Sequence, residues 1–262
     1  MPLSDIELQP GTVPIQHKLR RVPLAARVEV KKMLKQMLDD GVIEPVECSL
    51  CISLVVITAK SDGSYRFCVD LHSLNKHVVA DTFPLPNINE LVLLLKGGGY
   101  FSKLDLCHAY HQIRLHEQSK PLTAFITTEG TFQFTRLAFG LCSAASVFQR
   151  MMAELFKGMQ NVLYFQDDIL IFGDSVQSHN IILQEVLQRM QAAGLTPRRD
   201  KCTFLEKEVE YLGYIISLEG VKPKRKLLQA IESAPAPTDK DQLRSFMGLV
   251  EYYSKFVDKF AT

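Results

Sequence analysis

The chain has 262 residues, of which 47% are hydrophobic and 23% charged, a balance that is ordinary for a globular protein. Its formal net charge of +1 does not announce a nucleic-acid-binding protein, and no apolar stretch reaches membrane-spanning length. The first residues, Met1 to Asp5, lack the basic and apolar pattern of a signal peptide. We therefore expect an intracellular protein, in the cytoplasm or the nucleus, with no membrane partner.

The first half of the chain alternates between helical and extended patterns. Residues 24–41 carry apolar positions at helical spacing and end at a glycine. Two apolar runs, 54–58 and 65–69, flank an Asp-Gly turn, which is typical of a β-hairpin. Residues 88–95 predict an amphipathic helix that three glycines end, and residues 100–106 predict a strand.

The second half continues this alternation without an internal repeat. We expect a hairpin over 124–134, helices over 144–159 and 179–193, a strand pair around 211–216 and a terminal helix from Thr238. This order predicts an α+β fold in which helices cover one face of an antiparallel sheet.

Two adjacent carboxylates, Asp167 and Asp168, lie between two apolar runs of the middle of the chain. Residues 162–165 and 169–172 are rich in aromatic and β-branched side chains, which predicts two buried strands joined by a three-residue turn. Repulsion between neighbouring carboxylates raises a pKa or demands a cation. A hard divalent metal is the natural partner, whereas a solvated acidic turn is the simpler interpretation of such a pair alone.

A third acid, Asp105, ends the apolar strand predicted at 100–106. If this strand neighbours the acidic hairpin in one sheet, three carboxylates converge at the sheet edge. Three carboxylates are a ligand set for two Mg²⁺ ions about 3.5–4 Å apart, the arrangement used for in-line phosphoryl transfer.

Ordered sequence blocks that span nearly the whole chain resemble the reverse transcriptases of gypsy-type (Ty3-like) LTR retrotransposons, the relatives of retroviral polymerases. The blocks are 41–45, 62–71 with 74–76, 101–106 with 109–113, 139–141 with 148–149, the acidic hairpin, 211–214 and 243–253. An isolated Asp-Asp pair is a weak signal, whereas seven blocks in the family's order are a specific one.

The resemblance implies a right-hand polymerase of the α+β class, with fingers, a palm built on a ferredoxin-like antiparallel sheet, and the start of a thumb. Residues 1–100 would form the fingers and the first palm segment. Residues 101–220 would form the palm with a fingers insertion and a primer-holding hairpin. Residues 221–262 would form a connector and the first thumb helix, so we expect protease, ribonuclease H and integrase regions to lie outside this sequence.

The same resemblance implies RNA-directed DNA polymerase activity, in which dNTPs are added to a primer on an RNA or DNA template. Asp105 and Asp167 would hold two Mg²⁺ ions, with Asp168 in support and Leu106 as a further metal ligand; Mn²⁺ is an alternative. The implied dNTP contacts are Lys60, Arg66, Tyr110 and Phe139. The implied template and primer contacts are Asn75, Lys76, Gln149, Leu212, Gly213, Tyr214, Gly248 and Tyr252.

Each of the implied nucleotide contacts has a chemical reason. Arginine can grip a triphosphate with a bidentate fork and lysine with a point charge. A ring at position 110, beneath the sugar, would clash with the 2′-hydroxyl that separates ribonucleotides from deoxyribonucleotides. A core tyrosine is the simpler interpretation of Tyr110 when it is taken alone.

Departures from the family pattern leave two alternatives open. Phe165 stands where tyrosine is usual, Gln166 replaces an apolar residue, Ala109 replaces glycine, and prolines are missing at Ala138 and Ala145. A catalytically decayed protein that only binds nucleic acid is one alternative. A two-metal nuclease is the other, although basic residues placed for a triphosphate argue against it. The oligomeric state is left open.

Overall fold

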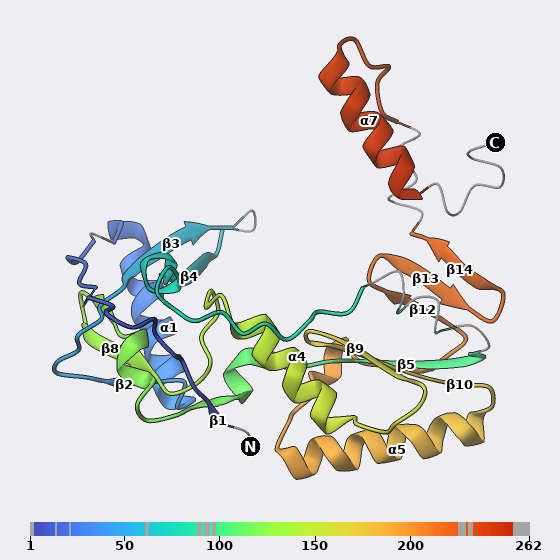
Figure 1. Cartoon of the computed structure of the whole chain (residues 1–262), viewed down its shortest axis with the longest axis horizontal. Coiled ribbons are helices and arrows are strands. Elements are labelled where there is room, and N and C mark those ends of the chain that lie inside the picture. The colour runs from blue at the N-terminus through green and yellow to red at the C-terminus, as the bar shows by residue number, and fades with distance from the viewer. Residues whose placement is uncertain are drawn as a thin grey trace.

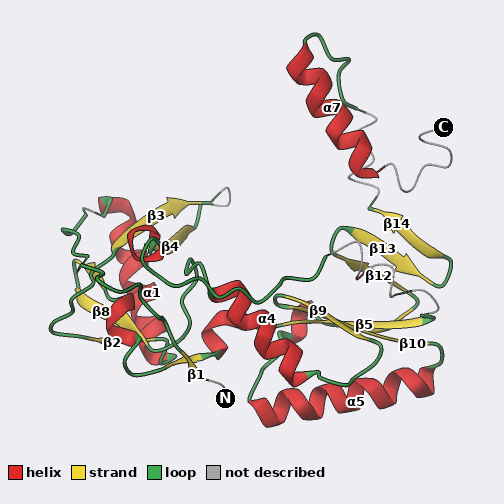
Figure 2. Cartoon of the chain, in the orientation of Figure 1, coloured by secondary structure: helices red, strands yellow, loops and turns green. Residues whose placement is uncertain are grey.

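The structure is a computed structural model that describes residues 3–13, 15–20, 22–60, 63–87, 91, 95, 98–224, 229 and 233–253. Its helices and strands form two lobes joined by extended segments (Figure 1). Both lobes mix helices with strands, which confirms the predicted α+β class (Figure 2). The helix predicted over 88–95 lies almost entirely outside the described residues.

The first lobe combines one long helix with short antiparallel strands. Helix α1 buries Val30 and Leu34 and ends just before Gly41, whose φ of 62° favours glycine. One sheet has the order β2-β8-β7, β3 forms a two-stranded sheet with β4, and β1 pairs in parallel with β6. The bounds are β1 Leu3–Ser4, α1 Arg27–Asp39, β2 Ile43–Pro45, β3 Leu54–Ala59, β4 Tyr65–Asp70, α2 His72–Asn75, β6 Arg114–Leu115, β7 Phe125–Thr127 and β8 Gly130–Phe134.

The second lobe is built on a four-stranded sheet of order β11-β5-β10-β9, all antiparallel. Helices α4 and α5 lie on one face of this sheet, and the hairpins of β12, β13 and β14 lie on the other (Figure 1). The bounds are β5 Tyr100–Asp105, α4 Ala144–Leu155, β9 Val162–Phe165, β10 Asp168–Gly173, α5 Val176–Ala193, β11 Thr203–Glu206, β12 Glu208–Tyr211, β13 Tyr214–Ser217 and β14 Gly220–Pro223.

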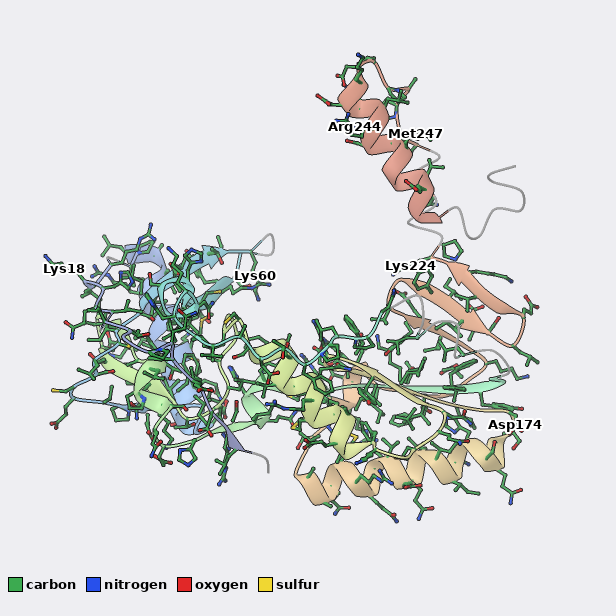
Figure 3. The ribbon with its side chains drawn as sticks, viewed as in Figure 1. Lys18, Lys60, Asp174, Lys224, Arg244 and Met247 are labelled. Carbon is green, nitrogen blue, oxygen red and sulfur yellow. The ribbon has the colours of Figure 1, made fainter. Side chains whose placement is uncertain are left out.

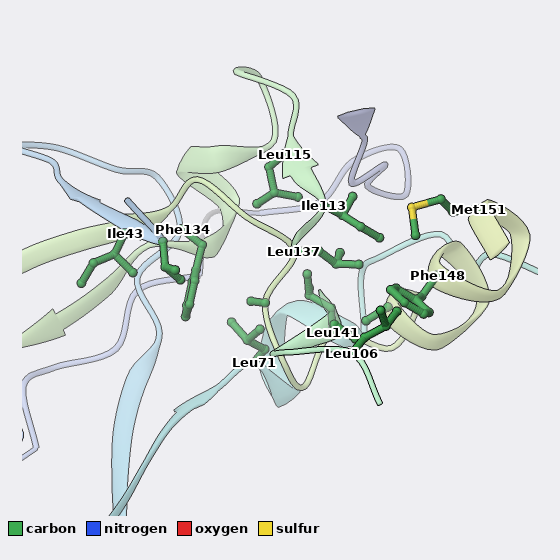
Figure 4. Close-up of a cluster of buried hydrophobic side chains, with 14 of the residues drawn as sticks. Ile43, Leu71, Leu106, Ile113, Leu115, Phe134, Leu137, Leu141, Phe148 and Met151 are labelled. Atoms are coloured by element: carbon green, nitrogen blue, oxygen red, sulfur yellow. The ribbon is translucent and has the colours of Figure 1, made fainter. Parts of the chain in front are cut away.

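A continuous apolar core runs through both lobes. Figure 4 shows part of it, where side chains of the first lobe meet those of α4. Phe148 of α4 is fully buried there and packs in the same cluster as Leu106, which directly follows β5. Burial of such large apolar side chains, at about 1.5–3 kcal/mol each, ties α4 to the end of β5. The end of β5 is therefore held in place from both lobes.

A second apolar cluster joins the sheet to the hairpins on its other face. Phe101, Leu170 and Phe172 of the sheet pack with Tyr211 and Tyr214 of the hairpins, and all five are at most 6% exposed. Side chains alternate between the two faces of a strand, so one face of β5 and β10 serves this cluster and the other face serves α4 and α5.

The last described helix, α7 (Lys240–Tyr253), stands apart from the sheet (Figure 1). The carboxylate of Asp239 accepts hydrogen bonds from the backbone N–H groups of Asp241 and Gln242 and so caps the helix. The terminal helix predicted from about Thr238 is therefore confirmed. It begins at Lys240, and Asp239 caps its first turn.

Candidate active site

The two acidic strands predicted from the sequence are neighbours. Asp105 is the last residue of β5, Asp168 is the first residue of β10, and the two are direct cross-strand partners. Asp167 lies in the turn that precedes β10 and is exposed. Its carbonyl accepts a hydrogen bond of 3.0 Å from the N–H of Leu106, which ties the turn to the end of β5.

The two paired carboxylates share one face of the sheet. Because side chains alternate along a strand, Asp105 lies on the side of Phe101, and Asp168 lies on the side of Leu170 and Phe172. The far end of this face is covered by the hairpins of β12–β14. The hairpins therefore leave the end with Asp105 and Asp168 uncovered, while the second apolar cluster packs against the other end of the same face.

The acidic turn is tighter than the sequence predicts. Phe165 of β9 pairs directly with Asp168, so only Gln166 and Asp167 form the turn, and Gln166 has a φ of 53°. Gln149 of α4 stabilises it from behind: the side-chain amide donates to the carbonyl of Tyr164, and the side-chain oxygen accepts from the N–H of Gln166, both at 3.3 Å.

The position of Gln149 gives it a structural role in the hairpin. The side chain is 2% exposed, and both of its polar ends are hydrogen-bonded to the hairpin backbone. Gln149 therefore positions the acidic hairpin, and its contact with a template stays a prediction.

Two lysines compensate the charge of the paired carboxylates. The Nζ of Lys103 lies 3.1 Å from Oδ1 of Asp168, and the Nζ of Lys201 lies 3.6 Å from Oδ2 of Asp105. Burial raises the pKa of Asp168 above its usual value, and the negative charges of Asp167 and Asp105 add to that rise, while Lys103 opposes it. The site therefore concentrates negative charge that an added cation would stabilise.

The donor chemistry fits a hard divalent cation. Asp105, Asp167 and Asp168 offer only carboxylate oxygens, the ligands that Mg²⁺ prefers. Within the described ranges, no three or more His, Cys, Asp and Glu side chains are gathered as a metal-binding group, and Asp105 and Asp168 each pair with a lysine. The buried hydroxyl of Tyr211 has no hydrogen-bond partner among the described atoms, and the charge of Asp168 contributes to its raised pKa after burial.

A cluster of aromatic rings, called here the aromatic floor, lies next to the acidic turn and includes Tyr110, Phe139 and Phe148. Tyr110 lies in the short helical turn Ala109–Gln112, with its ring centroid 4.9 Å from that of Phe139 and 5.7 Å from that of Phe148. Burial raises the pKa of Tyr110, and the charge of Asp167 contributes, which places this ring near the acidic turn. Phe139 is 50% exposed, so an aromatic face is open to a ligand there.

His111 belongs to the same floor and was not singled out from the sequence. Its ring centroid lies 4.9 Å from that of Phe139 in an edge-on arrangement. Burial lowers the pKa of His111 to about 4, and the charges of His108 and Arg136 add to this effect. A polar-aromatic run from 107 to 115 is the only sequence signal, and it does not distinguish His111 from its neighbours.

The basic residues expected to grip a triphosphate lie on the β3–β4 hairpin of the first lobe. Lys60 is at the tip, where its N–H donates to the carbonyl of Ser64, and Arg66 is paired with Thr58 (Figure 3). Both side chains are exposed, and neither forms an ion pair with a described carboxylate. Both cationic side chains are therefore accessible to a ligand, and they lie on a different lobe from the acidic strands.

The remaining predicted contacts fall into different environments. The side chain of Asn75 donates to the carbonyl of Gly140 and accepts from the N–H of Cys142, so it secures the loop after Phe139, while Lys76 is exposed. Leu212 and Gly213 form the β12–β13 turn, with φ values of 50° and 86°. The side chain of Tyr214 is 1% exposed in the second cluster, and its contact with a primer stays a prediction.

Gly248 and Tyr252 lie on α7, away from the acidic strands. A Cβ added at Gly248 would meet no atom within 4 Å, so there is open space at this position of the helix.

Residues 58–216 match the protein family described as reverse transcriptase (RNA-dependent DNA polymerase). The chain belongs to this family. It is 35% identical over 254 residues to the retrovirus-related Pol polyprotein from transposon opus of Drosophila melanogaster, covering 95% of this chain and 25% of that protein. It is 32% identical over 239 residues to the corresponding polyprotein from transposon gypsy of the same organism, covering 88% of this chain and 23% of that protein. The resemblance to gypsy-type reverse transcriptases is confirmed, and the chain spans about a quarter of these relatives' length.

The fold is that of a right-hand polymerase. A structure of the foamy viral protease-reverse transcriptase in complex with double-stranded DNA matches with a TM-score of 0.86 at 23% identity, covering 99% of this chain and 46% of that one. Among the described residues of this reverse transcriptase domain, no helix has the length and apolar character needed to span a bilayer.

Proposed function

We propose that this chain is the polymerase domain of an RNA-directed DNA polymerase, which extends a primer 3′-hydroxyl with dNTPs on an RNA or DNA template. The observation that carries the proposal is the direct pairing of Asp105 with Asp168 at the open end of the palm sheet, beside Asp167 and the exposed ring of Phe139. Family membership and the right-hand fold support it.

The three aspartates would hold two Mg²⁺ ions, or Mn²⁺, with the Leu106 carbonyl as a further ligand. Bound in this way, the ions would supply charge stabilisation for the attacking oxygen and for the leaving pyrophosphate. The sheet keeps Asp105 and Asp168 at a fixed separation, and Gln149 fixes the turn that carries Asp167. The protein would thus contribute mainly by positioning the metal ligands, and correct positioning is a large part of how phosphoryl transfer is accelerated.

The nucleotide would lie on the aromatic floor next to the acidic turn. Tyr110 would lie beneath the sugar and exclude a 2′-hydroxyl, and Phe139 would pack against the nucleotide. Lys60 and Arg66 would bind the triphosphate from the fingers hairpin after the lobes approach each other.

Template and primer would occupy the space between the fingers, the palm hairpins and α7. The proposed contacts are Lys76, the Leu212–Gly213 turn, and the residues Gly248 and Tyr252 of α7. The similar foamy viral structure is itself a complex with double-stranded DNA, which supports a nucleic-acid partner. We assign residues 1–100 to the fingers and first palm segment, 101–220 to the palm with its insertion and primer hairpin, and 221–262 to the connector and thumb.

Templated extension tests this function. The chain is incubated with Mg²⁺, a DNA primer and four RNA templates that differ in the first unpaired base, with one dNTP at a time. We expect addition of the complementary dNTP in each case. Primer binding without extension would instead identify a nucleic-acid-binding remnant, and shortening of the primer without dNTP dependence would identify a nuclease.

A further inference from the structure

Lys103 lies on the catalytic face of the palm sheet, between the hydrophobic cluster and the aspartates. It precedes Asp105 by two residues on β5 and therefore points to the same face. It pairs across the sheet with Leu170 of β10 and with Thr203 of β11, so strands enclose it on both sides. Its alkyl chain is thus held by the sheet, with the ammonium directed toward the acidic end.

The Lys103 ammonium is already bound to one of the proposed metal ligands. Its Nζ lies 3.1 Å from Oδ1 of Asp168, and the side chains of the two residues are 24% and 25% exposed. Lys201 makes a looser pair with Asp105, at 3.6 Å, and is 52% exposed. A partly buried carboxylate without a cation would be costly, so Lys103 stabilises the acidic site when no metal is bound.

We propose that Lys103 is a resident counter-cation of the acidic site, which a divalent metal ion must displace from Asp168 before that carboxylate can act as a ligand. The inference rests on the proposed function, because it takes the aspartates to be metal ligands. Lysine suits this role because its ammonium is a single charge on a flexible four-carbon chain that can withdraw. Arginine, with a planar fork, would hold a carboxylate through two hydrogen bonds.

Displacement has a measurable consequence. Because metal and ammonium compete for one carboxylate, Lys103 lowers the metal affinity of the site, and removing its charge strengthens metal binding. A purely structural ion pair would behave in the opposite way, since its loss would loosen Asp168 and weaken metal binding or leave it unchanged. Lys103 is therefore a positioning residue that acts through Asp168.

Mn²⁺ binding to the whole chain, measured by electron paramagnetic resonance of free Mn²⁺, tests the proposal without any catalytic assay. We compare wild type with Lys103→Met, Lys103→Gln and Asp168→Asn. Both neutral variants at position 103 should bind Mn²⁺ about threefold to tenfold more tightly than wild type. Lys201→Met is the matched control, and because Lys201 is more exposed it should change affinity less.

Thermal unfolding provides the second measurement. Without metal, both neutral variants at position 103 should melt below wild type, and saturating Mn²⁺ should raise their melting temperature by more than it raises that of wild type. Having two neutral variants keeps the test decisive if one of them does not fold.

The outcomes separate this inference from the proposed function. If Asp168→Asn weakens Mn²⁺ binding while the position-103 variants bind no more tightly than wild type, the counter-cation role is overturned and the metal site stands. If wild type binds Mn²⁺ equally well with and without the Asp168 carboxylate, the counter-cation role is likewise overturned. If wild type binds no Mn²⁺, the metal site itself is refuted, and the inference falls with it.

Discussion

At the scale of single residues, polar side chains that bond to the backbone shape this site as much as the carboxylates do. Gln149 satisfies the backbone of the acidic turn, and Asn75 does the same for the loop that follows Phe139. The family resemblance predicts both residues as template contacts, and those contacts stay predictions. The hydrogen bonds that they make to the site loops could not be predicted from the sequence, because they depend on how α4 and α2 pack against those loops.

Replacing Gln149 with leucine should destabilise the domain. The substitution leaves a carbonyl and an N–H of the acidic turn unsatisfied, which costs about 1–3 kcal/mol of unfolding free energy. Urea denaturation measures the loss. Gln160→Leu is the matched control, because Gln160 is exposed and should change stability little. Equal effects of the two substitutions would contradict the positioning role of Gln149.

Replacing Tyr110 with valine should admit ribonucleotides. The ring of Tyr110 packs on Phe139 and Phe148, and removing it opens space where a 2′-hydroxyl would lie. We expect the ratio of kcat/KM for dNTP over rNTP to fall roughly tenfold or more. Tyr110→Phe keeps the ring and should keep the discrimination. An unchanged ratio in the valine variant would remove Tyr110 from this role.

His111 should make the stability of the domain depend on pH. Its pKa is about 4 in the folded chain and 6.5 in the unfolded chain, so the unfolded state binds the proton first as the pH falls. Stability is therefore complete above pH 6.5 and declines between pH 6.5 and about 4, by on the order of 2 kcal/mol. Urea denaturation at pH 7.5 and pH 5 measures this decline. His111→Phe should reduce it and His72→Gln, at an exposed site, should not; an identical pH dependence in all three proteins would refute the assignment.

At the scale of elements, the sequence predicts strands and helices well where apolar periodicity is strong, and their ends less well. Helix α5 begins at Val176 rather than at the predicted His179, because the Ser175 and Ser178 side chains form a capping box that adds a first turn. The acidic turn has two residues instead of three because Gln166 adopts a positive φ, which its residue type does not announce. Both differences come from local polar contacts rather than from periodicity.

Gly173, at the end of β10, marks a close approach between strand and helix. A Cβ at this position would lie 2.7 Å from the backbone nitrogen of His179 in the first turn of α5. Gly173→Ala should therefore cost about 1–3 kcal/mol of stability, measured by thermal or urea unfolding. Gly248→Ala is the opposite control, since it lies in a helix with open space and should stabilise slightly. A neutral Gly173→Ala would show that β10 and α5 can separate without cost.

At the scale of the whole molecule, the two lobes are interleaved in sequence and continuous in their core. Residues as distant as Ile43, Leu106 and Phe148 belong to one apolar cluster, so the acidic strands are supported by segments from both lobes (Figure 4). The fold class and the pairing of Asp105 with the acidic hairpin could be predicted from strand patterns and ordered family blocks. The lysine partners of the aspartates could not, because an ion pair depends on register across strands that are far apart in sequence.

The central claim is that the acidic face of β5 and β10 catalyses nucleotide addition. Rapid-quench measurement of single-nucleotide addition to a primer on an RNA template, in Mg²⁺, tests it most directly in wild type, Asp167→Asn and Asp174→Asn. Asp174 is an exposed carboxylate just beyond the other end of β10, so its variant carries the same chemical change away from the site (Figure 3). The account predicts a loss of roughly a thousandfold or more for Asp167→Asn and little change for Asp174→Asn. Addition at the wild-type rate by a folded Asp167→Asn protein would contradict it.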